Sequence, residues 1–251
     1  MGKVEDEKGY LIDLLIHDLR TPLSVVTTTV SNLLQKTDRY GPLTEGQKSA
    51  LERALRNSRK AQQLVEEMLE ISRSREGVFQ KERFPVEKMI TDSFRDALEA
   101  ISPDLADRLG GVGDTKELKS LLEREGIFVH MKGRYCETSF CHDRRKVGQI
   151  LRNLINNGLK YRRRRLSLSI EGERDLIVSV EDDGLGIPLA DQEAVFERFV
   201  RLKNENGPDV PGLGLGLPGV KALVEAMGGE IRLTSCEGGG ACFTVRIPPL
   251  E

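Results

Sequence analysis

The feature that most restricts the fold of this chain is a regular spacing of core-type residues between residues 44 and 73. These residues recur at alternating intervals of four and three, at Leu51, Leu55, Ser58, Gln62, Val65, Leu69 and Ser72. Such heptad spacing is typical of the seam of a coiled coil or a helix bundle. The stripe is widened by Ala54, Ala61, Leu64, Met68 and Ile71. Because a single helical hairpin would leave much of this stripe in water, we expect two hairpins to pack as a four-helix bundle in a homodimer.

The partner helix is predicted over residues 3–36, where an apolar stripe has helical periodicity. The members of this stripe are Leu15, Leu19, Pro22, Val26, Val30 and Leu33. Residues 37–43 are rich in turn formers and separate the two helices. The second helix is predicted to begin at Thr44, because Gln47 three residues later completes a capping box.

One histidine in the first helix has no role in packing that stripe. On a helical wheel with ~100° per residue and Leu15 as origin, His17 lies away from the stripe, and Thr21 projects on nearly the same side. Asp18 is adjacent and can accept the other ring proton, so that a nitrogen lone pair points outward. Pro22 is predicted to bend the helix just past the histidine. From these residues alone, a nucleophilic histidine and an ordinary surface histidine are both open.

The pattern changes after residues 73–77, and Phe84 begins a segment in which helices and strands alternate. Helices are predicted over residues 86–100, 115–125, 143–161, 189–201 and 217–227. Strands are predicted over residues 127–131, 166–170, 175–181, 230–234 and 241–247. This alternation favours an α/β sandwich, in which a mixed, mostly antiparallel sheet lies under helices. The expected fold class is thus α plus α/β, with domains at residues 1–77 and 85–251 and a linker at residues 78–84.

Charge and hydropathy exclude two classes of partner. The 251 residues carry a formal net charge of -2, which gives no general attraction to nucleic acid. No apolar run approaches the ~18 residues that a membrane span needs, and the first eight residues contain no apolar signal core. We therefore expect a cytoplasmic chain, either a whole protein or the cytoplasmic part of a larger one.

The helix predicted over residues 143–161, with Asp143 placed as its N-cap, carries a polar face. Asn153, Asn157 and Lys160 lie at positions i, i+4 and i+7 on that face. Amide oxygens there can bind Mg²⁺, and a lysine one turn further on can meet phosphate oxygens. An ordinary polar surface is the alternative.

The first of two glycine-rich segments follows a predicted strand and contains Asp182, Gly184 and Gly186. Glycines there allow the backbone to approach a planar ligand closely. A carboxylate can accept a hydrogen bond from the exocyclic amine of adenine. The alternative is a glycine-rich turn without a ligand.

The second glycine-rich segment contains Gly212, Gly214 and Gly216 and runs directly into a helix. Backbone amides at such a helix N-terminus form a phosphate cradle. No Gly-Lys-Ser/Thr follows, so the segment is not a Walker A motif, and its spacing is not that of a dinucleotide fold. Between the two segments, Phe196 and Phe199 offer aromatic packing, and residues 203–211 are predicted to form a flexible lid.

The order of these motifs resembles that of the H, N, G1, F and G2 boxes of two-component sensor histidine kinases. The matching segments begin at His17, Asn153, Asp182, Phe196 and Gly212 and span nearly the whole chain. The resemblance implies a dimerisation and phosphotransfer hairpin with His17 as phosphoacceptor, followed by an ATP-binding domain of the Bergerat type. It also implies transfer to an aspartate of a response regulator receiver domain. Membrane contact would come only through a sensory region absent from this chain.

The resemblance also implies a role for each matching residue. Asp18 would be the general base, and Thr21 would serve a phosphatase step toward the regulator. Asn153 and Asn157 would hold Mg²⁺ through the phosphates of ATP, and Lys160 would meet the phosphates themselves. The other implied nucleotide contacts are Tyr161 at the nucleotide edge, Asp182 at the adenine amine, and Gly184, Gly186, Gly212, Gly214 and Gly216.

Three features depart from the family pattern. The family usually has glutamate after the phosphoacceptor, and Asp18 is one methylene shorter. Residues 162–165 are four arginines where a small hydroxyl residue commonly follows the position of Tyr161, and we expect a solvated surface there rather than a site for an acidic partner. Residues 102–115 are longer than the family norm and are predicted to form a loop or lid without an assigned role.

Two rival functions fit the motifs less well. ATP hydrolysis in related branches uses a glutamate one helical turn before the metal-binding asparagine, and that position here is Asn153, which is not a base at neutral pH. A docking scaffold without catalysis would not need intact nucleotide motifs. Phosphoryl transfer to a protein nucleophile is therefore favoured.

Overall fold

The computed structural model divides the chain into two compact units, residues 1–73 and 74–251. The described residues are 2–73, 79–101, 115–197, 199–200, 202 and 214–250. Within helices, the side chains outside the description are those of residues 2–18, 60, 63–64, 66–73, 99–101 and 115–118. In the described ranges no helix combines the length and the apolar character that crossing a bilayer requires.

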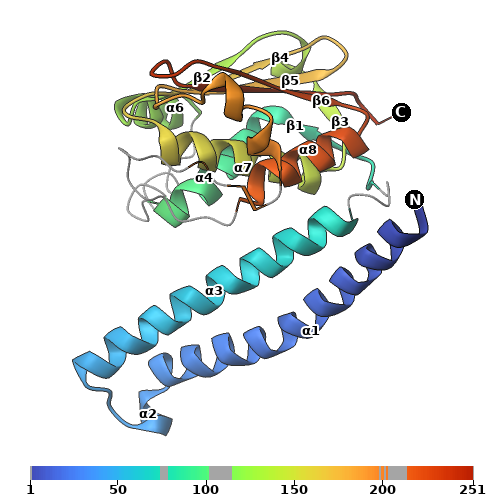
Figure 1. Cartoon of the computed structure of the whole chain (residues 1–251). Helices are drawn as coiled ribbons and strands as arrows, with labels where there is room; N and C mark the ends of the chain where they lie inside the picture. Colours follow the sequence, from blue (N-terminus) through green and yellow to red (C-terminus); the bar gives the residue numbers. More distant parts are fainter. Residues whose placement is uncertain are drawn as a thin grey trace. The chain divides into compact units, whose positions relative to one another are not determined.

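The first unit is a helical hairpin (Figure 1). Helix α1 (Gly2–Gln35) packs along helix α3 (Glu45–Arg73), so the two long helices are confirmed. Pro22 lies inside α1, and the axis of this helix curves along its length in Figure 1. The capping box is also confirmed, because the Thr44 N–H donates to Gln47 Oε1 at 2.9 Å and the Gln47 N–H donates to Thr44 Oγ1 at 3.3 Å.

Part of the predicted turn between these helices is itself helical. Residues Thr37–Tyr40 form the short helix α2, in which the Tyr40 N–H donates to the Lys36 carbonyl at 3.1 Å. Gly41 then ends the helix with a φ of 84°, a conformation that favours glycine. The irregular chain between the long helices is therefore limited to Lys36 and the segment from Gly41 to Thr44.

A polar layer lies in the seam between α1 and α3. Thr27 Oγ1 is 2.8 Å from Ser58 Oγ and 2.9 Å from Gln62 Oε1. Ser58 and Gln62 are two of the predicted seam positions, and Ser58 is buried. Because buried polar groups must meet partners at the right height, this layer fixes the axial register of the hairpin.

The predicted apolar stripe of α1 is not the face that packs on α3 within one chain. Leu19 and Val26 are 51% and 46% exposed. Contact is made instead by a neighbouring row, in which Leu23 and Thr27 are half-buried and face the hydroxyl of Ser58. The hydrogen-bond partners on α3 select this row, and in the single chain Leu19, Pro22 and Val26 of the apolar stripe stay exposed while Val30 and Leu33 are half-buried.

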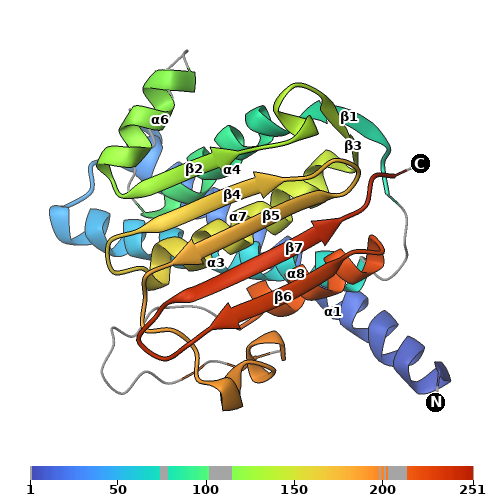
Figure 2. The same ribbon diagram turned by 90° about the horizontal axis from the view of Figure 1, so that it is seen from above.

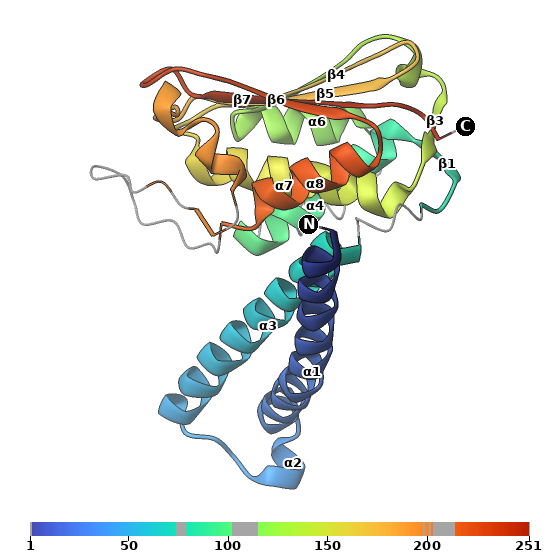
Figure 3. The ribbon, with the colours of Figure 1, turned by 45° about the vertical axis from the view of Figure 1, so that its right-hand side comes forward.

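The second unit is a five-stranded sheet with helices on one of its faces (Figures 2 and 3). In spatial order the strands are β2 (Ile127–Met131), β4 (Leu166–Glu171), β5 (Leu176–Asp182), β7 (Ala241–Ile247) and β6 (Glu230–Ser235). Strands β2 and β4 pair in parallel, and the other neighbours pair antiparallel. The helices are α4 (Val86–Ile101), α6 (Thr115–Arg124), α7 (Arg144–Tyr161) and α8 (Gly216–Ala226). The predicted fold class is confirmed.

Two four-residue strands were not predicted from the sequence. Strand β1 (Glu82–Pro85) pairs antiparallel with β3 (Ser139–His142), and buried Phe84 lies opposite buried Phe140. The first three residues of β1 fall in the segment expected to be a linker. The chain therefore joins the packing of the second unit before residue 85.

The helix predicted over residues 189–201 is wrong. The described part of this segment contains two separate 3₁₀ turns, η3 (Leu189–Asp191) and η4 (Ala194–Phe196). Glu197 is extended and Phe199 has a φ of 66°, so an α-helix cannot continue through them. The predicted lid at residues 203–211 and most of the predicted loop at residues 102–115 lie outside the described residues, and Thr115 begins α6.

Candidate functional site

Helix α7 carries the polar face on which the predicted site depends. Asp143 caps this helix, because its Oδ1 accepts the Lys146 N–H at 3.1 Å. The apolar face of α7 is buried through Val147, Ile150, Leu151, Leu154, Ile155 and Leu159. Asn153 and Asn157 are half-buried and Lys160 is exposed. The polar residues thus lie at the margin of the core, where a ligand can reach them.

A glycine sets how closely α7 approaches the sheet. A Cβ at Gly158 would lie 2.3 Å from Leu166 Cδ1 and 3.3 Å from Val180 Cγ1, which belong to β4 and β5. A side chain at this position would force the helix and the sheet apart, because the core around it is already filled. Gly158 therefore fixes the position of Asn157, its neighbour, relative to the sheet.

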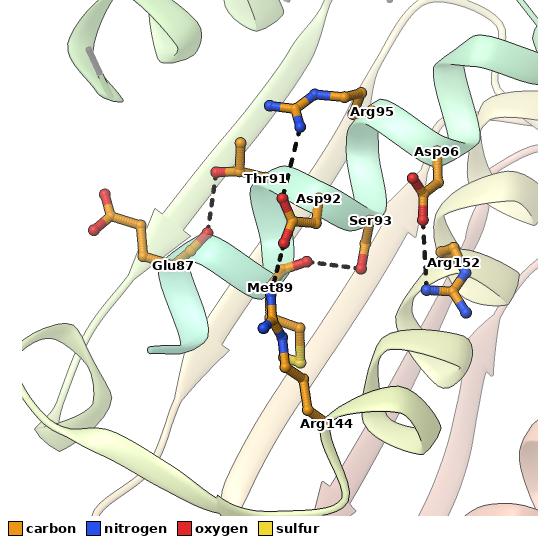
Figure 4. A network of polar contacts seen from close by, with 9 residues as sticks. All are labelled: Glu87, Met89, Thr91, Asp92, Ser93, Arg95, Asp96, Arg144 and Arg152. Carbon is orange, nitrogen blue, oxygen red and sulfur yellow. Dashed lines mark hydrogen bonds and ion pairs between the residues drawn. The ribbon is translucent and has the colours of Figure 1, made fainter. Parts of the chain in front are cut away.

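Ion pairs to α4 also anchor α7 (Figure 4). Arg144 Nη2 lies 2.8 Å from Asp92 Oδ2, and Arg152 Nη1 lies 3.5 Å from Asp96 Oδ2. The four side chains are partly exposed, so each pair stabilises the fold by at most about 1 kcal/mol. Arg152 directly precedes Asn153, so one of these pairs anchors the helix turn that carries the first predicted asparagine.

The second glycine-rich segment meets α7 at that asparagine. Gly216 is the first residue of α8, and a Cβ there would lie 3.3 Å from Asn153 Oδ1. The structure thus brings Gly216 and Asn153 together, although they are far apart in the sequence. The predicted phosphate cradle and the predicted magnesium face lie side by side.

Asp182 ends β5 as a buried carboxylate, 7% exposed. Its Oδ1 accepts the Gly184 N–H at 2.8 Å. Burial raises the pKa of Asp182, while hydrogen bonds from the amides of Gly184 and Ala241 oppose this rise. A carboxylate kept from water in this way gains more than a solvated one from an additional donor such as an amine.

The two glycines after Asp182 are required by packing within the protein. A Cβ at Gly184 would lie 2.3 Å from the Tyr161 carbonyl oxygen and 2.7 Å from Asp182 Oδ1. Gly186 has a φ of 73°, and a Cβ there would lie 1.9 Å from the Cys236 carbonyl oxygen. The sequence argument attributed these glycines to close approach of a ligand, but protein backbone fills both positions. The contact through Gly184 brings Tyr161, at the end of α7, next to Asp182.

The glycines of the second segment are described only in part. Gly212 lies outside the described residues. Gly214 has a φ of 69°, and a Cβ there would lie 2.5 Å from the Val200 carbonyl oxygen. The Gly214 carbonyl also accepts the Phe199 N–H at 3.0 Å. Gly214 therefore holds the start of α8 against the segment that contains Phe199.

Asp183, next to Asp182, has a structural role that the sequence did not predict. Its Oδ1 accepts three successive backbone N–H groups, those of Arg163, Arg164 and Arg165, at 2.8, 3.0 and 2.9 Å. Partial desolvation raises the pKa of Asp183, but these amides outweigh it and hold the pKa below its usual value. These three arginine side chains are exposed, as expected for a solvated surface, but Arg162 departs from that expectation, because it is half-buried and its Nη1 donates to the Glu125 carbonyl at 2.9 Å. The sequence did hold one signal for this role, the pair of adjacent aspartates. The predicted contact to the adenine amine accounts for only one of these two carboxylates.

The predicted phosphoacceptor lies in the first unit. His17 and Asp18 fall within α1, and their side chains lie outside the described part of the chain. Thr21, also on α1, is exposed. The structure therefore places Thr21 on the accessible surface of the hairpin, as the helical wheel predicts.

A hollow on the surface of the second unit lies apart from these residues. It is lined by Gln192, Glu193, Phe196, Glu197, Lys221 and Leu233. The Lys221 ammonium lies 5.5 Å from the centre of the Phe196 ring. None of the lining residues belongs to the predicted nucleotide set, so this hollow is not assigned to ATP.

Two family models match the chain, one in each unit. The model of the His Kinase A (phospho-acceptor) domain matches residues 7–77, which include His17. The model of the histidine kinase-, DNA gyrase B- and HSP90-like ATPase matches residues 142–251, which include every predicted nucleotide contact.

Curated proteins are similar along nearly the whole chain. The circadian input-output histidine kinase CikA of Synechococcus elongatus is 30% identical over 247 residues, which cover 96% of this chain and 30% of that protein. The sensor histidine kinase WalK of Bacillus subtilis is 27% identical over 266 residues, which cover 99% of this chain and 38% of that protein. The chain thus spans about a third of the length of these relatives.

Solved structures share the fold. The crystal structure of full-length ShkA in complex with AMPPNP has a TM-score of 0.69 at 24% identity and covers 96% of this chain and 46% of that one. The Acinetobacter baumannii histidine kinase AdeS has a TM-score of 0.56 at 23% identity and covers 94% of this chain and 98% of that one. At these identities the likeness concerns the fold.

Proposed function

Because this chain belongs to the family of two-component sensor histidine kinases, we propose that it transfers the γ-phosphoryl group of ATP to His17 and then to an aspartate of a response regulator receiver domain. The observation that carries this proposal is the gathering of two distant segments at the polar face of α7. Gly216 lies against Asn153, and Gly184 lies between Tyr161 and Asp182. These two groups are separated by eight residues of helix, about 12 Å along its axis.

Each end of this face has a distinct chemistry. At one end, the buried carboxylate of Asp182 accepts a hydrogen bond from the adenine amine, and Tyr161 covers the edge of the nucleotide. Asn153 at the other end and Asn157 midway along the face would present neutral oxygens for Mg²⁺ bound to the phosphates, and Lys160, next to Tyr161 in the sequence, would neutralise phosphate charge. Mg²⁺ suits this donor set, because it usually takes only one or two protein oxygens together with substrate phosphates and water. Its contribution is to neutralise charge on the triphosphate.

The amino acids present favour transfer over hydrolysis. The position from which a glutamate would activate water is Asn153, whose amide cannot accept a proton at neutral pH. In the proposed reaction a ring nitrogen of His17 forms a bond to the γ-phosphorus while the bond to the bridging oxygen breaks, and ADP leaves. Asp18 acts as general base and accepts the proton of the other ring nitrogen, which removes the positive charge that develops on the ring.

The second transfer needs mainly positioning. The phosphoramidate on His17 has a good leaving group, so a receiver carboxylate oxygen bonds to phosphorus as the P–N bond breaks and the imidazole is regenerated. The proposal includes a homodimer, which is supported by the exposed part of the apolar stripe of α1. A second hairpin would cover Leu19 and Val26, which the single chain leaves about half exposed.

A phosphorylation assay with γ-labelled ATP and Mg²⁺ tests the proposed function. We expect label on the protein that is lost in acid and retained in base, because a phosphoramidate hydrolyses when its nitrogen is protonated. Free labelled phosphate without labelled protein would indicate a hydrolase and contradict the proposal. The absence of both products would indicate a docking scaffold and would contradict it equally.

Asp18 and Thr21 are expected to act in different steps. Asp18→Asn should slow autophosphorylation about 10²- to 10⁴-fold, because it removes a general base, yet leave transfer from pre-formed phosphohistidine nearly unchanged. Thr21→Ala should spare both steps and slow the loss of phosphate from the receiver, because the hydroxyl orients water there. The three rates are measured with a cognate receiver. Equal loss of kinase and transfer rates in Asp18→Asn would make Asp18 structural, and unchanged dephosphorylation in Thr21→Ala would remove its role.

A further inference from the structure

The turn between β6 and β7 lies directly against the loop that follows Asp182. The Gly238 N–H donates to the Leu185 carbonyl at 2.6 Å. A Cβ at Gly186 would lie 1.9 Å from the Cys236 carbonyl oxygen, and a Cβ at Gly240 would lie 1.9 Å from the Asp182 carbonyl oxygen. The two segments are therefore in backbone contact along their length, with no room for side chains between them.

Ser235, the last residue of β6, links the two segments through its hydroxyl. Its Oγ accepts the Ile187 N–H at 2.8 Å and donates to the Gly240 carbonyl at 2.6 Å. Its side chain is half-buried. A single hydroxyl thus satisfies one backbone group in each segment, and each of these groups lies outside a regular strand or helix.

Gln192, directly after η3, completes the link from the other side. Its Nε2 donates to the Ile187 carbonyl at 3.0 Å and to the Ser235 carbonyl at 2.9 Å. Both backbone polar groups of Ile187 are therefore held by side chains, the N–H by Ser235 and the carbonyl by Gln192. Ile187 is fixed as firmly as a strand residue, although it belongs to a loop.

The loop between Asp182 and Ile187 is held at both of its ends. Asp182 is fixed in the sheet, where it pairs with Ala241 on β7. Ile187 is fixed by Ser235 and Gln192. The residues between them include Gly184, which packs against Tyr161 and the Asp182 carboxylate. We propose that Ser235 and Gln192 are positioning residues for nucleotide binding, which hold the loop from Asp182 to Ile187, here called the base loop, in its binding geometry.

The inference rests on the proposed function and predicts which end of the nucleotide is affected. Ser235 and Gln192 contact the base loop, whereas the proposed phosphate contacts Asn153, Asn157 and Lys160 lie on α7. Loss of the link should therefore weaken binding of the base and leave phosphoryl transfer unchanged once ATP is bound. A residue that only stabilised the fold would lower the melting temperature without changing the discrimination between bases.

The primary variant is Ser235→Ala, which removes both hydroxyl bonds. We expect the Kd for ADP to rise about 5- to 30-fold, the range expected when a partly buried pair of hydrogen bonds is lost. The KM for ATP in autophosphorylation should rise in parallel, while kcat at saturating ATP stays within about twofold. The preference for ADP over GDP, measured as a ratio of two Kd values, should shrink.

Two further variants and a control sharpen the test. Ser235→Thr keeps the hydroxyl and should restore the ADP affinity. Gln192→Glu keeps the shape of Gln192 but places a carboxylate oxygen against two carbonyl oxygens, so it should weaken ADP binding as well, and this variant decides the test if Ser235→Ala does not fold. Thr234→Ala is the matched control, because Thr234 is an exposed neighbour on the same strand.

The outcomes separate this inference from the proposed function. Failure of the unmodified chain to bind ADP would overturn the proposed function and the inference with it. Normal ADP binding by Ser235→Ala, alongside binding by the unmodified chain, would overturn the inference alone. A lowered melting temperature with an unchanged ratio of ADP to GDP affinity, or a fall in kcat with unchanged KM, would also overturn it.

Discussion

The variant His17→Gln is expected to carry no phosphoryl label after incubation with γ-labelled ATP, whereas His130→Gln is expected to be labelled like the unmodified chain. Glutamine has no nitrogen lone pair that can attack phosphorus, because the amide nitrogen is conjugated with its carbonyl. His130 is an exposed residue of β2 and makes a matched control for a change of side chain at a surface position.

The third histidine, His142, needs no variant of its own, because it is buried. His142 is 1% exposed, its Nδ1 accepts the Asp143 N–H at 2.7 Å, and burial lowers its pKa. It cannot meet a phosphoryl donor without unfolding of β3. The measurement is label per chain after denaturation, with ADP binding by calorimetry as a check on His17→Gln. Label on His17→Gln, or its loss from His130→Gln, would refute the assignment of the phosphoacceptor.

Asp182→Asn is expected to weaken ATP binding about 10- to 150-fold, the loss that corresponds to a hydrogen bond to a charged group. The new amide nitrogen would face the adenine amine, a donor against a donor.

Asn157→Asp should weaken binding for a different reason, since it places an anion near the triphosphate. Both variants should remain dimeric, because the apolar stripe lies in the other unit. Calorimetry and sedimentation measure the two properties, and normal affinity in either variant would show that its residue does not contact the nucleotide as proposed.

The variant Asp182→Asn also has an expected signature in the pH dependence of stability. Because burial raises the pKa of Asp182, the folded chain binds more protons than the unfolded chain at pH values between the ordinary and the raised pKa. Stability without nucleotide therefore falls as pH rises through this window, and Asp182→Asn lacks that loss. The melting temperature of Asp182→Asn relative to the unmodified chain should rise as the pH increases from the ordinary pKa of an aspartate, about 4, to the raised pKa of Asp182. A constant difference would contradict the raised pKa.

The long periodic elements were predictable from the sequence, and the short ones were not. Spacing alone predicted α1, α3 and the five strands of the main sheet, because the apolar residues of each element form a pattern long enough to recognise. Strands β1 and β3 have four residues each, too few for a period to emerge, and each depends on the other for pairing. The error over residues 189–201 has another cause. The apolar residues there recur at helical spacing, but they belong to two separate 3₁₀ turns and contact other elements from those turns.

For the candidate site, the sequence could propose residues by chemical type, but it could not reveal which contacts within the protein they make. Asn153, Asp182 and Gly216 could be selected by chemical type, and the structure brings Gly216 to Asn153. The reason for Gly184 and Gly186 is packing against Tyr161 and Cys236, which no local pattern reveals. The same holds for Asp183 and Ser235, because their partners lie far away in the sequence.

The polar layer of Thr27, Ser58 and Gln62 restricts how the two helices of the hairpin can slide. A purely apolar seam allows small shifts along the helix axis at little cost, because one methyl group replaces another. Here a shift of one residue would separate the hydroxyl of Thr27 from Ser58 and leave buried Ser58 without this partner. Sliding of α1 against α3 is therefore opposed at this layer, because it breaks the contacts of Thr27 with both Ser58 and Gln62. An axial displacement of α1 at this level thus tends to carry α3 with it.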